Sequence, residues 1–487
     1  MKRPGGALIL DPAFGRSHGA PRFRQLYAEI RHAILTGRLR PGDRLPSTRT
    51  LASDLGVSRT TTEEAFAQLQ AEGYLTRRTG DGTYVSTLAA VSGTRSSRVA
   101  RPAGRRPALS ARGTLLARSS HPEPVHARAF NAGSPPFDAF PLDVWARLLT
   151  ARMKRSGGEL LAYGEPAGYR PLREAIASYL RTSRGVHASA DEILVLTSSQ
   201  QALDLIGRLL LDPGDTACLE EPGYPSAAAA LQAAGAVLCP VPVDESGLQV
   251  ERLRECPRAR LVYVTPSHQY PTGVTLPLDR RLALLAWASE TGAWIVEDDY
   301  DSEFRYAGRP LAAVQGLDTR GRVLYVGTFS KMMFPSIRIA YLVVPPELAE
   351  PFAVGRSLLD GHTALHTQAA LADFMEHGQF ALHLRRMRSL CAERRDALLA
   401  ATATLPAERL RLGVAEGGFR VTAWLGRGID EAAVVRRGRD EGLDLPRLSR
   451  CYLGEPRRGL ILGYTGLSPS AIAKAVRLLR RVLAPRS

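Results

Sequence analysis

Short, continuously apolar segments recur from residue 126 onward, and they constrain the fold of this chain more than any other feature. They are Ile193–Thr197, Ala217–Leu219, Leu261–Val264, Trp294–Val296 and Val323–Val326. Apolar character without alternation is typical of parallel strands that are buried on both faces of a sheet. Helical patterns such as Gln200–Leu211 and Asp279–Thr291 lie between these segments. The region is therefore predicted to be an α/β domain with a mostly parallel sheet.

Residues 22–86 carry a different pattern, which indicates three short helices followed by a β-hairpin. Apolar residues at helical spacing predict a first helix over Phe23–Leu35. Ser47 and Ser58 are candidate N-caps of a second helix and of a third, which runs over Arg59–Glu72. The β-prone runs of the hairpin are Tyr74–Thr76 and Thr83–Val85. This succession predicts a winged helix-turn-helix, an α+β fold that places one helix in the DNA major groove.

Positive charge is concentrated in the N-terminal quarter of the chain. The net charge is +16, and residues 1–125 hold 20 Lys+Arg against 9 Asp+Glu. This asymmetry favours contact with a polyanion, although a solvated basic tail would give the same balance. Residues 87–125 are rich in Ser, Ala, Arg, Gly and Pro, which predicts a flexible basic linker. The predicted organisation is a tail (1–21), the winged helix (22–86), the linker (87–125) and a large domain (126–487).

Membrane and disulfide-rich proteins are disfavoured. No apolar run approaches the length of a membrane span or of a signal-peptide core, so a cytoplasmic protein is expected. The cysteines are odd in number and widely spaced, which predicts reduced thiols, no disulfide framework and no metal site. They are Cys218, Cys239, Cys256, Cys391 and Cys451.

Lysine is rare, since only four of the 64 basic residues are lysine. A cofactor that is bound as an imine, such as pyridoxal phosphate, requires a lysine, because arginine cannot form the bond. Lys2 falls in the tail, and Lys154 and Lys474 fall on helical stretches with polar faces. Lys331 follows an apolar strand through a hydroxyl-rich turn, which is where α/β folds bind ligands. Lys331 is therefore the candidate.

Other requirements of pyridoxal phosphate are met by residues at strand ends. The strand at 294–296 runs into an acidic cluster that includes Asp298 and is followed by Tyr300. Such a cluster repels itself unless it has a cationic partner, although a solvated acidic loop is the alternative. Candidate phosphate ligands are the hydroxyl and amide groups at a helix start and the groups that flank the lysine. They are Ser199, Gln200, Thr328, Ser330 and Arg338, and Tyr224 follows a further strand in position to stack on a ring.

Two stretches of the N-terminal region, Gly37–Ser47 and 51–60, resemble the GntR family of bacterial winged-helix repressors. The segments 72–75 and 80–85 match the family as well. The resemblance implies DNA contacts by Arg49, Ser58, Arg59, Thr60, Thr61 and Gly82. Glu63 departs from the family, because some members carry a DNA-contacting arginine there.

The large domain resembles fold-type I aminotransferases at Tyr163-Gly164, Pro271-Thr272-Gly273 and Ser330-Lys331. The stretches Thr265–Pro271 and Glu297–Tyr306 are similar to the MocR (GabR-like) subfamily, which joins a GntR winged helix to an aminotransferase-like domain. The resemblance implies a pyridoxal-phosphate-dependent transferase fold with a small α+β C-terminal subdomain.

The same resemblance assigns roles to the candidate residues. Lys331 would carry pyridoxal phosphate as an aldimine, and Asp298 would pair with its ring nitrogen. Tyr300 would bond the ring hydroxyl, Tyr224 would stack on the ring, and the phosphate would be held by Ser199, Gln200, Thr328, Ser330 and Arg338. The carboxylate of an effector would be bound by Arg450 or, as a second choice, Arg458. Ser226 departs from the γ-aminobutyrate-responsive member, which has an arginine there.

The expected function is that of a transcription regulator whose operator binding responds to pyridoxal phosphate or to an amine or amino acid. By resemblance it would be a head-to-tail homodimer. A working aminotransferase with a DNA-binding appendage remains an alternative, because its cofactor residues are present. The domain order and the basic N-terminal quarter favour regulation. A regulator that has lost its cofactor is disfavoured, because Lys331, Asp298, Tyr300 and Arg338 are retained.

Overall fold

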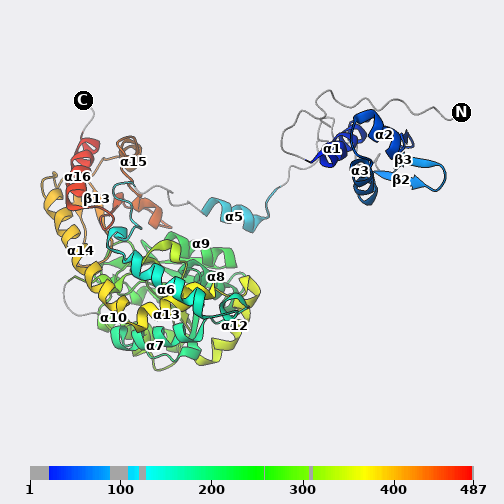
Figure 1. Cartoon of the computed structure of the whole chain (residues 1–487). Helices are drawn as coiled ribbons and strands as arrows, with labels where there is room; N and C mark the ends of the chain where they lie inside the picture. The colour runs from blue at the N-terminus through cyan, green and yellow to red at the C-terminus, as the bar shows by residue number, and fades with distance from the viewer. Residues whose placement is uncertain (1–20, 88–107, 120–127, 257, 307–310, 485–487) are drawn as a thin grey trace. The chain divides into compact units, whose positions relative to one another are not determined.

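A computed structural model describes residues 21–87, 108–119, 128–256, 258–306 and 311–484. The chain divides into two units, Met1–Ala108 and Leu109–Ser487 (Figure 1). The boundary falls within the predicted linker. The predicted N-terminal tail, with Lys2, and most of that linker lie outside the described residues. Among the described helices, none is both long and apolar enough to cross a membrane.

Over the described residues 21–87, the N-terminal unit forms three helices and a three-stranded antiparallel sheet. Its elements are α1 (Arg22–Leu35), β1 (Arg44–Leu45), α2 (Thr48–Leu55), α3 (Arg59–Ala71), β2 (Leu75–Arg78) and β3 (Gly82–Val85), with the strands in the order β1-β3-β2. Both predicted caps are confirmed, because Ser47 accepts from the Thr50 N–H and Ser58 from the Thr61 N–H. Leu26, Ile30 and Leu69 are fully buried between the helices. The apolar spacing that predicted the helices therefore builds the core of a winged helix.

The large unit is built on an eight-stranded sheet. In sheet order the strands are β4 (Ile193–Leu196), β11 (Ala340–Val343), β10 (Val323–Thr328), β9 (Trp294–Asp299), β8 (Ala259–Val264), β5 (Thr216–Glu221), β6 (Val237–Asp244) and β7 (Gly247–Leu248). The pairs from β10 through β6 are parallel, whereas β11 is antiparallel to both neighbours. All the predicted strands are present, but β6, β7 and β11 were not predicted.

Helices cover both faces of this sheet. They are α6 (Leu142–Arg155), α7 (Arg170–Arg184), α8 (Ser199–Leu210), α9 (Pro225–Ala234), α10 (Leu278–Thr291), α12 (Pro346–Asp360) and α13 (Leu365–Glu376). In β4, Ile193 and Val195 pack into the core that α7 and α13 cover, and Leu194 and Leu196 pack into the core beneath α8 and α9. The strand is thus buried on both faces, as its continuous apolar character predicted.

A smaller subdomain follows the sheet, as expected. It consists of α14 (Gln379–Thr402), β12 (Leu410–Leu412), β13 (Arg420–Leu425), α15 (Glu431–Asp440), β14 (Gly459–Gly463) and α16 (Pro469–Leu483). Its three strands form an antiparallel sheet in the order β12-β13-β14. The buried apolar face of α16, including Ile472, Val476 and Leu479, packs in one core with this sheet.

The predicted flexible linker contains a helix, α5 (Ala111–Ser119). The helix begins after Ser110, whose hydroxyl accepts from the Gly113 N–H at 3.0 Å. It lies against α9, and Leu116 and Ala230 line the same surface depression. Composition alone hid this helix, because a local cap and a tertiary contact stabilise a segment poor in large apolar residues.

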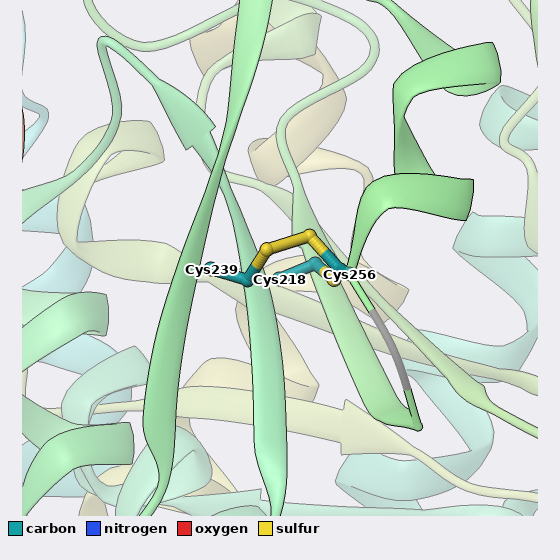
Figure 2. Close-up of side chains that lie close together, drawn as sticks. All are labelled: Cys218, Cys239 and Cys256. Carbon is teal, nitrogen blue, oxygen red and sulfur yellow. A yellow bond between two sulfur atoms is a disulfide. The ribbon is translucent and has the colours of Figure 1, made fainter.

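The prediction of five reduced thiols is wrong for one pair. Cys239 on β6 and Cys256, which follows the 3-10 helix η4 (Val250–Glu255), form a disulfide (Figure 2). Cys218 lies opposite Cys239 in the β5–β6 register. Sequence spacing could not reveal this group, because the strand register and the path of η4 bring the residues together.

Candidate functional site

A cavity of about 340 Å³ lies where the carboxyl ends of the central strands meet the start of α8. Every residue predicted to hold pyridoxal phosphate lines it: Lys331, Asp298, Tyr300, Tyr224, Ser199, Gln200, Thr328, Ser330 and Arg338. Ala132, Gly133, Ser198, Tyr263, Tyr270, Pro335 and Arg420 complete the lining. These residues come from segments far apart in the sequence, so the parallel sheet assembles the site at its carboxyl edge.

Lys331 lies on the short helix α11 (Phe329–Met332), directly after β10. Its Nζ donates to the Gly133 carbonyl at 2.8 Å. The Thr328 hydroxyl accepts from the Ser330 N–H at 3.1 Å and so fixes the turn that carries the lysine. Lys154 and Lys474 are exposed, as expected, and Lys331 is the only lysine among the described residues that lines the cavity.

Asp298 has one satisfied and one unsatisfied oxygen. Its Oδ2 accepts from the Tyr263 hydroxyl at 2.7 Å, whereas Oδ1 is buried and has no partner among the described residues. Burial raises the pKa of Asp298 to about 7, and the Tyr263 hydrogen bond opposes that shift. A buried, unpaired carboxylate oxygen at the cavity wall fits a protonated ring nitrogen, which would supply the missing donor and positive charge.

The start of α8 forms the opposite end of the cavity. Ser198 caps this helix by accepting from the Gln201 N–H at 3.1 Å, and Ser199 and Gln200 occupy its first turn. The free N–H groups and the positive end of the helix dipole favour an anion there. Ser330 and Arg338 line the same cavity and add a hydroxyl and a guanidinium. The donors present therefore suit a phosphate group.

Arg420, at the start of β13, lines the cavity and was not predicted from the sequence. Its guanidinium carbon lies 4.3 Å from the centroid of the Tyr270 ring and 4.8 Å from that of Tyr300. The side chain is buried, and its Nε has no partner among the described residues. Arg450 and Arg458 are both exposed and neither lines the cavity. The effector role of Arg450 and Arg458 therefore stays a prediction, whereas Arg420 lies at the cavity.

A sequence signal for Arg420 exists in the two glycines before it. Gly418 has φ of +75°, and a Cβ on it would collide with the ring of His268. A glycine pair that precedes an apolar strand, separated from the arginine at its start by Phe419, indicates a close backbone approach. That approach brings the start of β13 against the loop that carries His268, next to the cavity.

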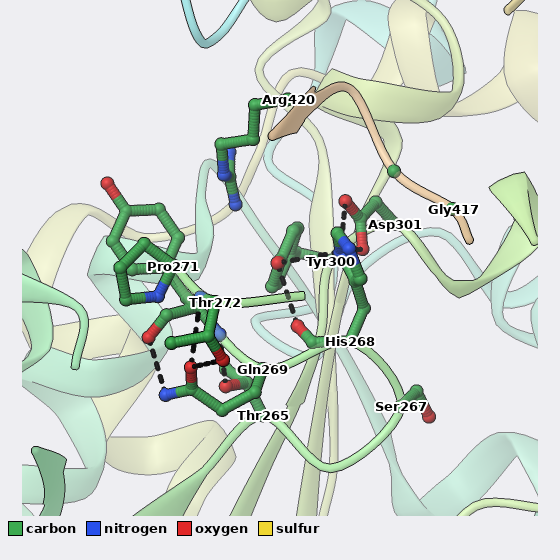
Figure 3. A network of polar contacts seen from close by, with 12 residues as sticks. Thr265, Ser267, His268, Gln269, Pro271, Thr272, Tyr300, Asp301, Gly417 and Arg420 are labelled. Carbon is green, nitrogen blue, oxygen red and sulfur yellow. Dashed lines mark hydrogen bonds and ion pairs between the residues drawn. The ribbon is translucent and has the colours of Figure 1, made fainter. Parts of the chain in front are cut away.

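Polar contacts around His268 hold the aromatic wall in place (Figure 3). Its Nδ1 lies 3.0 Å from both Asp301 carboxylate oxygens and 3.1 Å from the Tyr300 hydroxyl. The Tyr300 hydroxyl donates to the His268 carbonyl at 2.8 Å. Gln269 donates to the Pro222 carbonyl at 2.8 Å and accepts from the Thr272 hydroxyl at 2.7 Å. The stretch that distinguished the subfamily in the sequence thus frames the cavity.

The predicted DNA contacts lie on one region of the N-terminal unit. Ser58 caps α3, Arg59, Thr60 and Thr61 form its first turn, and Arg49 is exposed on α2. A groove between α2, α3 and the hairpin is lined by Ser47, Arg59, Arg77 and Gly82, among others. The polar start of α3 therefore borders an open groove beside the hairpin.

Two of these residues have intramolecular roles. The Arg59 Nε pairs with the Glu63 Oε1 at 2.7 Å, and both side chains are exposed. Gly82 has φ of +120°, and a Cβ there would lie 3.0 Å from the Arg44 Nε. Glycine is thus required by the hairpin itself.

Comparisons with known proteins agree with both units. Residues 23–85 match the bacterial regulatory proteins of the gntR family, and residues 129–422 match aminotransferase class I and II. The probable rhizopine catabolism regulatory protein MocR of Rhizobium meliloti is 42% identical over 97% of this chain and 95% of its own length. The HTH-type transcriptional regulator TauR of Rhodobacter capsulatus is 34% identical over 99% of this chain and 100% of its own. A kynurenine aminotransferase structure from Pyrococcus horikoshii is 29% identical, with a TM-score of 0.69 over 78% of this chain and 95% of that chain.

The fold and the cavity define a winged-helix DNA-binding protein that carries a pyridoxal-phosphate-dependent aminotransferase fold of type I. The chain belongs to the MocR-like family of GntR-type transcription regulators. Pyridoxal phosphate is accordingly its cofactor. The resemblance seen in the sequence is confirmed.

Proposed function

We propose that this regulator works in the cytoplasm as a sensor. The cavity around Lys331 binds pyridoxal phosphate, or an amine or amino acid that reacts with it, and this binding controls the affinity for the operator. The unpaired, buried Asp298 Oδ1 carries the proposal. An unsatisfied carboxylate oxygen in a protein core is costly, and a cationic ring nitrogen would relieve it.

Nine side chains of the cavity have a proposed task in holding the cofactor. Lys331 would hold the cofactor, and Asp298 would keep the ring nitrogen protonated. Tyr224 would stack on the ring, Tyr300 would bond the ring hydroxyl, and Ser199, Gln200, Thr328, Ser330 and Arg338 would bind the phosphate. When bound, pyridoxal phosphate supplies an electrophilic carbon that captures an amine.

Arg420 is proposed to bind the carboxylate of an amino-acid effector. It replaces Arg450 and Arg458 in that role, because its cation lies at the cavity between Tyr270 and Tyr300. The Nε that has no partner among the described residues leaves a charged donor ready for a carboxylate.

The response at DNA requires two arrangements of the protein that differ in effector affinity. We propose a head-to-tail homodimer, as the family resemblance implies, in which the α3 helices of the two subunits contact the two halves of an operator. Arg49, Ser58, Arg59, Thr60 and Thr61 would touch DNA.

A second candidate function is transamination. It is favoured by the complete set of cofactor residues in the cavity. Turnover of an amino donor on the order of 1–1,000 per second would identify a working enzyme. Binding of the donor with a spectral change but without sustained turnover would identify a sensor.

A footprint on the DNA upstream of the protein's own gene tests the proposal. We expect protection of an operator that changes when pyridoxal phosphate or an effective amine is added. Lys331→Ala should bind DNA without this response, whereas Lys154→Ala, with an exposed lysine changed, should respond normally. An identical footprint in the wild type with and without cofactor and amines would overturn the sensor function.

A further inference from the structure

Three cysteines gather on one face of the large sheet, away from the cavity lining (Figure 2). Cys218 lies on β5, Cys239 on β6, and Cys256 just after η4. Their sulfur atoms all lie within 4.8 Å of one another. The Cα atoms of Cys239 and Cys256 are 6.0 Å apart, a separation that suits a disulfide without movement of the backbone.

The disulfide spans a strand. In the sheet β5 lies between β6 and β8, and Cys256 precedes β8, which starts at Ala259. The bond from Cys239 to Cys256 therefore ties β6 to the start of β8, across β5. Further along, β5 leads to Tyr224, and β8 carries Tyr263, which donates to Asp298.

The surroundings of the sulfur atoms are apolar. Cys218 and Cys256 are buried in a core with Val241, Leu253 and Val262, and Cys239 packs against it. Burial raises the pKa of Cys218 to about 12. A metal ion would require thiolates, and no fourth side-chain ligand belongs to the group among the described residues. A neutral disulfide places no charge in this core, so it fits the site better than a metal does.

We propose that Cys239 and Cys256 are a reversible oxidation site for hydroperoxides, and that Cys218 stays a reduced thiol beside them. Cys239 is half-buried, whereas Cys218 and Cys256 are buried, so a peroxide would meet Cys239 first. The Cys239 thiol gives up its proton and attacks one peroxide oxygen, the O–O bond breaks, and a sulfenic acid forms while the other oxygen leaves with that proton as water. The neutral Cys256 thiol then attacks that sulfur, the S–S bond forms, the S–O bond breaks, and the hydroxyl group leaves with the Cys256 proton as the second water. Two thiols are oxidised, and one hydrogen peroxide is reduced to two waters.

Thiol counting on the full-length protein tests the site. After reduction, the denatured wild type should show five thiols, and after treatment with equimolar hydrogen peroxide it should show three. Mass spectrometry should join the peptides that contain Cys239 and Cys256, and dithiothreitol should restore five thiols. Cys391→Ser, which removes a distant buried thiol, should still lose two thiols, whereas Cys239→Ser should form no intramolecular disulfide.

Several outcomes would overturn the proposal. These are five remaining thiols in the peroxide-treated wild type, a disulfide that includes Cys218, and stoichiometric zinc in the reduced protein that Cys218→Ser removes. The last result would assign a metal site instead.

Thermal unfolding gives a second readout. A disulfide that closes this short loop restricts the unfolded chain, so the oxidised wild type should unfold several degrees higher than the reduced form. The difference should vanish in Cys239→Ser and persist in Cys391→Ser. Equal midpoints for the two wild-type forms would contradict a bond that stabilises the three strands.

Discussion

The predicted DNA-contact surface and the cofactor cavity are organised in opposite ways. On the first, Ser58, Arg59, Thr60 and Thr61 are consecutive and largely exposed, and one capped helix turn presents them. In the second, Lys331 and Asp298 come from different strand ends, and burial shifts the pKa of the carboxyl group. Changes at the exposed surface should therefore act locally and modestly, whereas changes in the cavity should be larger and coupled.

The largest effect is expected at Lys331. Lys331→Ala should abolish the visible absorption of the lysine-bound cofactor, because no other lysine among the described residues lines the cavity. The absorption spectrum of the purified protein with added pyridoxal phosphate measures this. Lys154→Ala should keep the band, since that lysine is exposed. A wild-type protein without this absorption would contradict the binding of the cofactor to Lys331 in the cavity.

Arg420→Gln should lower the affinity for a carboxylate-bearing amine by roughly 10- to 100-fold. The reason is the loss of a charge-assisted hydrogen bond to the carboxylate, which contributes about 1.5–3 kcal/mol. Spectral titration with an amino acid and with the amine that lacks its carboxylate measures the effect. The variant should lose the preference for the amino acid, and Arg450→Gln should retain it. The reverse result would restore Arg450 to the role.

Arg59→Ala should weaken operator binding by roughly 1–3 kcal/mol if its guanidinium reads a base. Gel-shift titration at fixed salt measures the affinity, and the cofactor spectrum should stay unchanged. Arg208→Ala is a matched control, because the Arg208 Nε likewise pairs with Asp204 at 2.7 Å on an exposed helix face. Unchanged operator binding would remove Arg59 from the contact surface.

Asp298 should give the cofactor-free protein a pH-dependent stability. Because its folded pKa is about 7, the folded state keeps a proton that the unfolded chain releases near pH 4. Stability should therefore fall as the pH rises from about 4 to about 7, by at most about 1.4 kcal/mol per pH unit for this group. Glu220 and Glu297, whose pKa values burial also raises to about 7, contribute in the same direction.

Asp298→Asn isolates the share of Asp298 in this slope. Urea unfolding between pH 5 and pH 7 should show a shallower fall in the variant than in the wild type, and Glu350→Gln, at an exposed position, should leave the fall unchanged. Equal slopes for Asp298→Asn and the wild type would show that the buried carboxyl group is not perturbed.

Local signals predicted much of the structure. The caps Ser47 and Ser58 specify their conformations through N–H groups three residues away, and Gly82 through its own positive φ. The apolar runs predicted the central parallel strands. No feature of the β11 sequence, however, indicates that this strand runs antiparallel to its neighbours. Side-chain burial is the same for a strand in either direction, so only the connections and the pairing decide it.

Cavity residues of a rare type could be predicted from the sequence, whereas a cavity residue of a common type could not. Lys331 could be selected because the chain has only four lysines and one of them follows an apolar strand. Arg420 competes with about sixty other arginines, and its position depends on how closely β13 approaches the His268 loop.

The sequence by itself determined the two-part organisation, the capped helices that carry the predicted DNA contacts, and the lysine, carboxylate and hydroxyl groups that suit pyridoxal phosphate. These depend on residue type and short-range spacing. Only the tertiary structure decided that Arg420 stands at the cavity, that Asp298 has one unpaired oxygen, and that Cys239 meets Cys256 beside Cys218. Those facts depend on which distant segments pack together, and burial in that packing determines which polar groups are left without a partner.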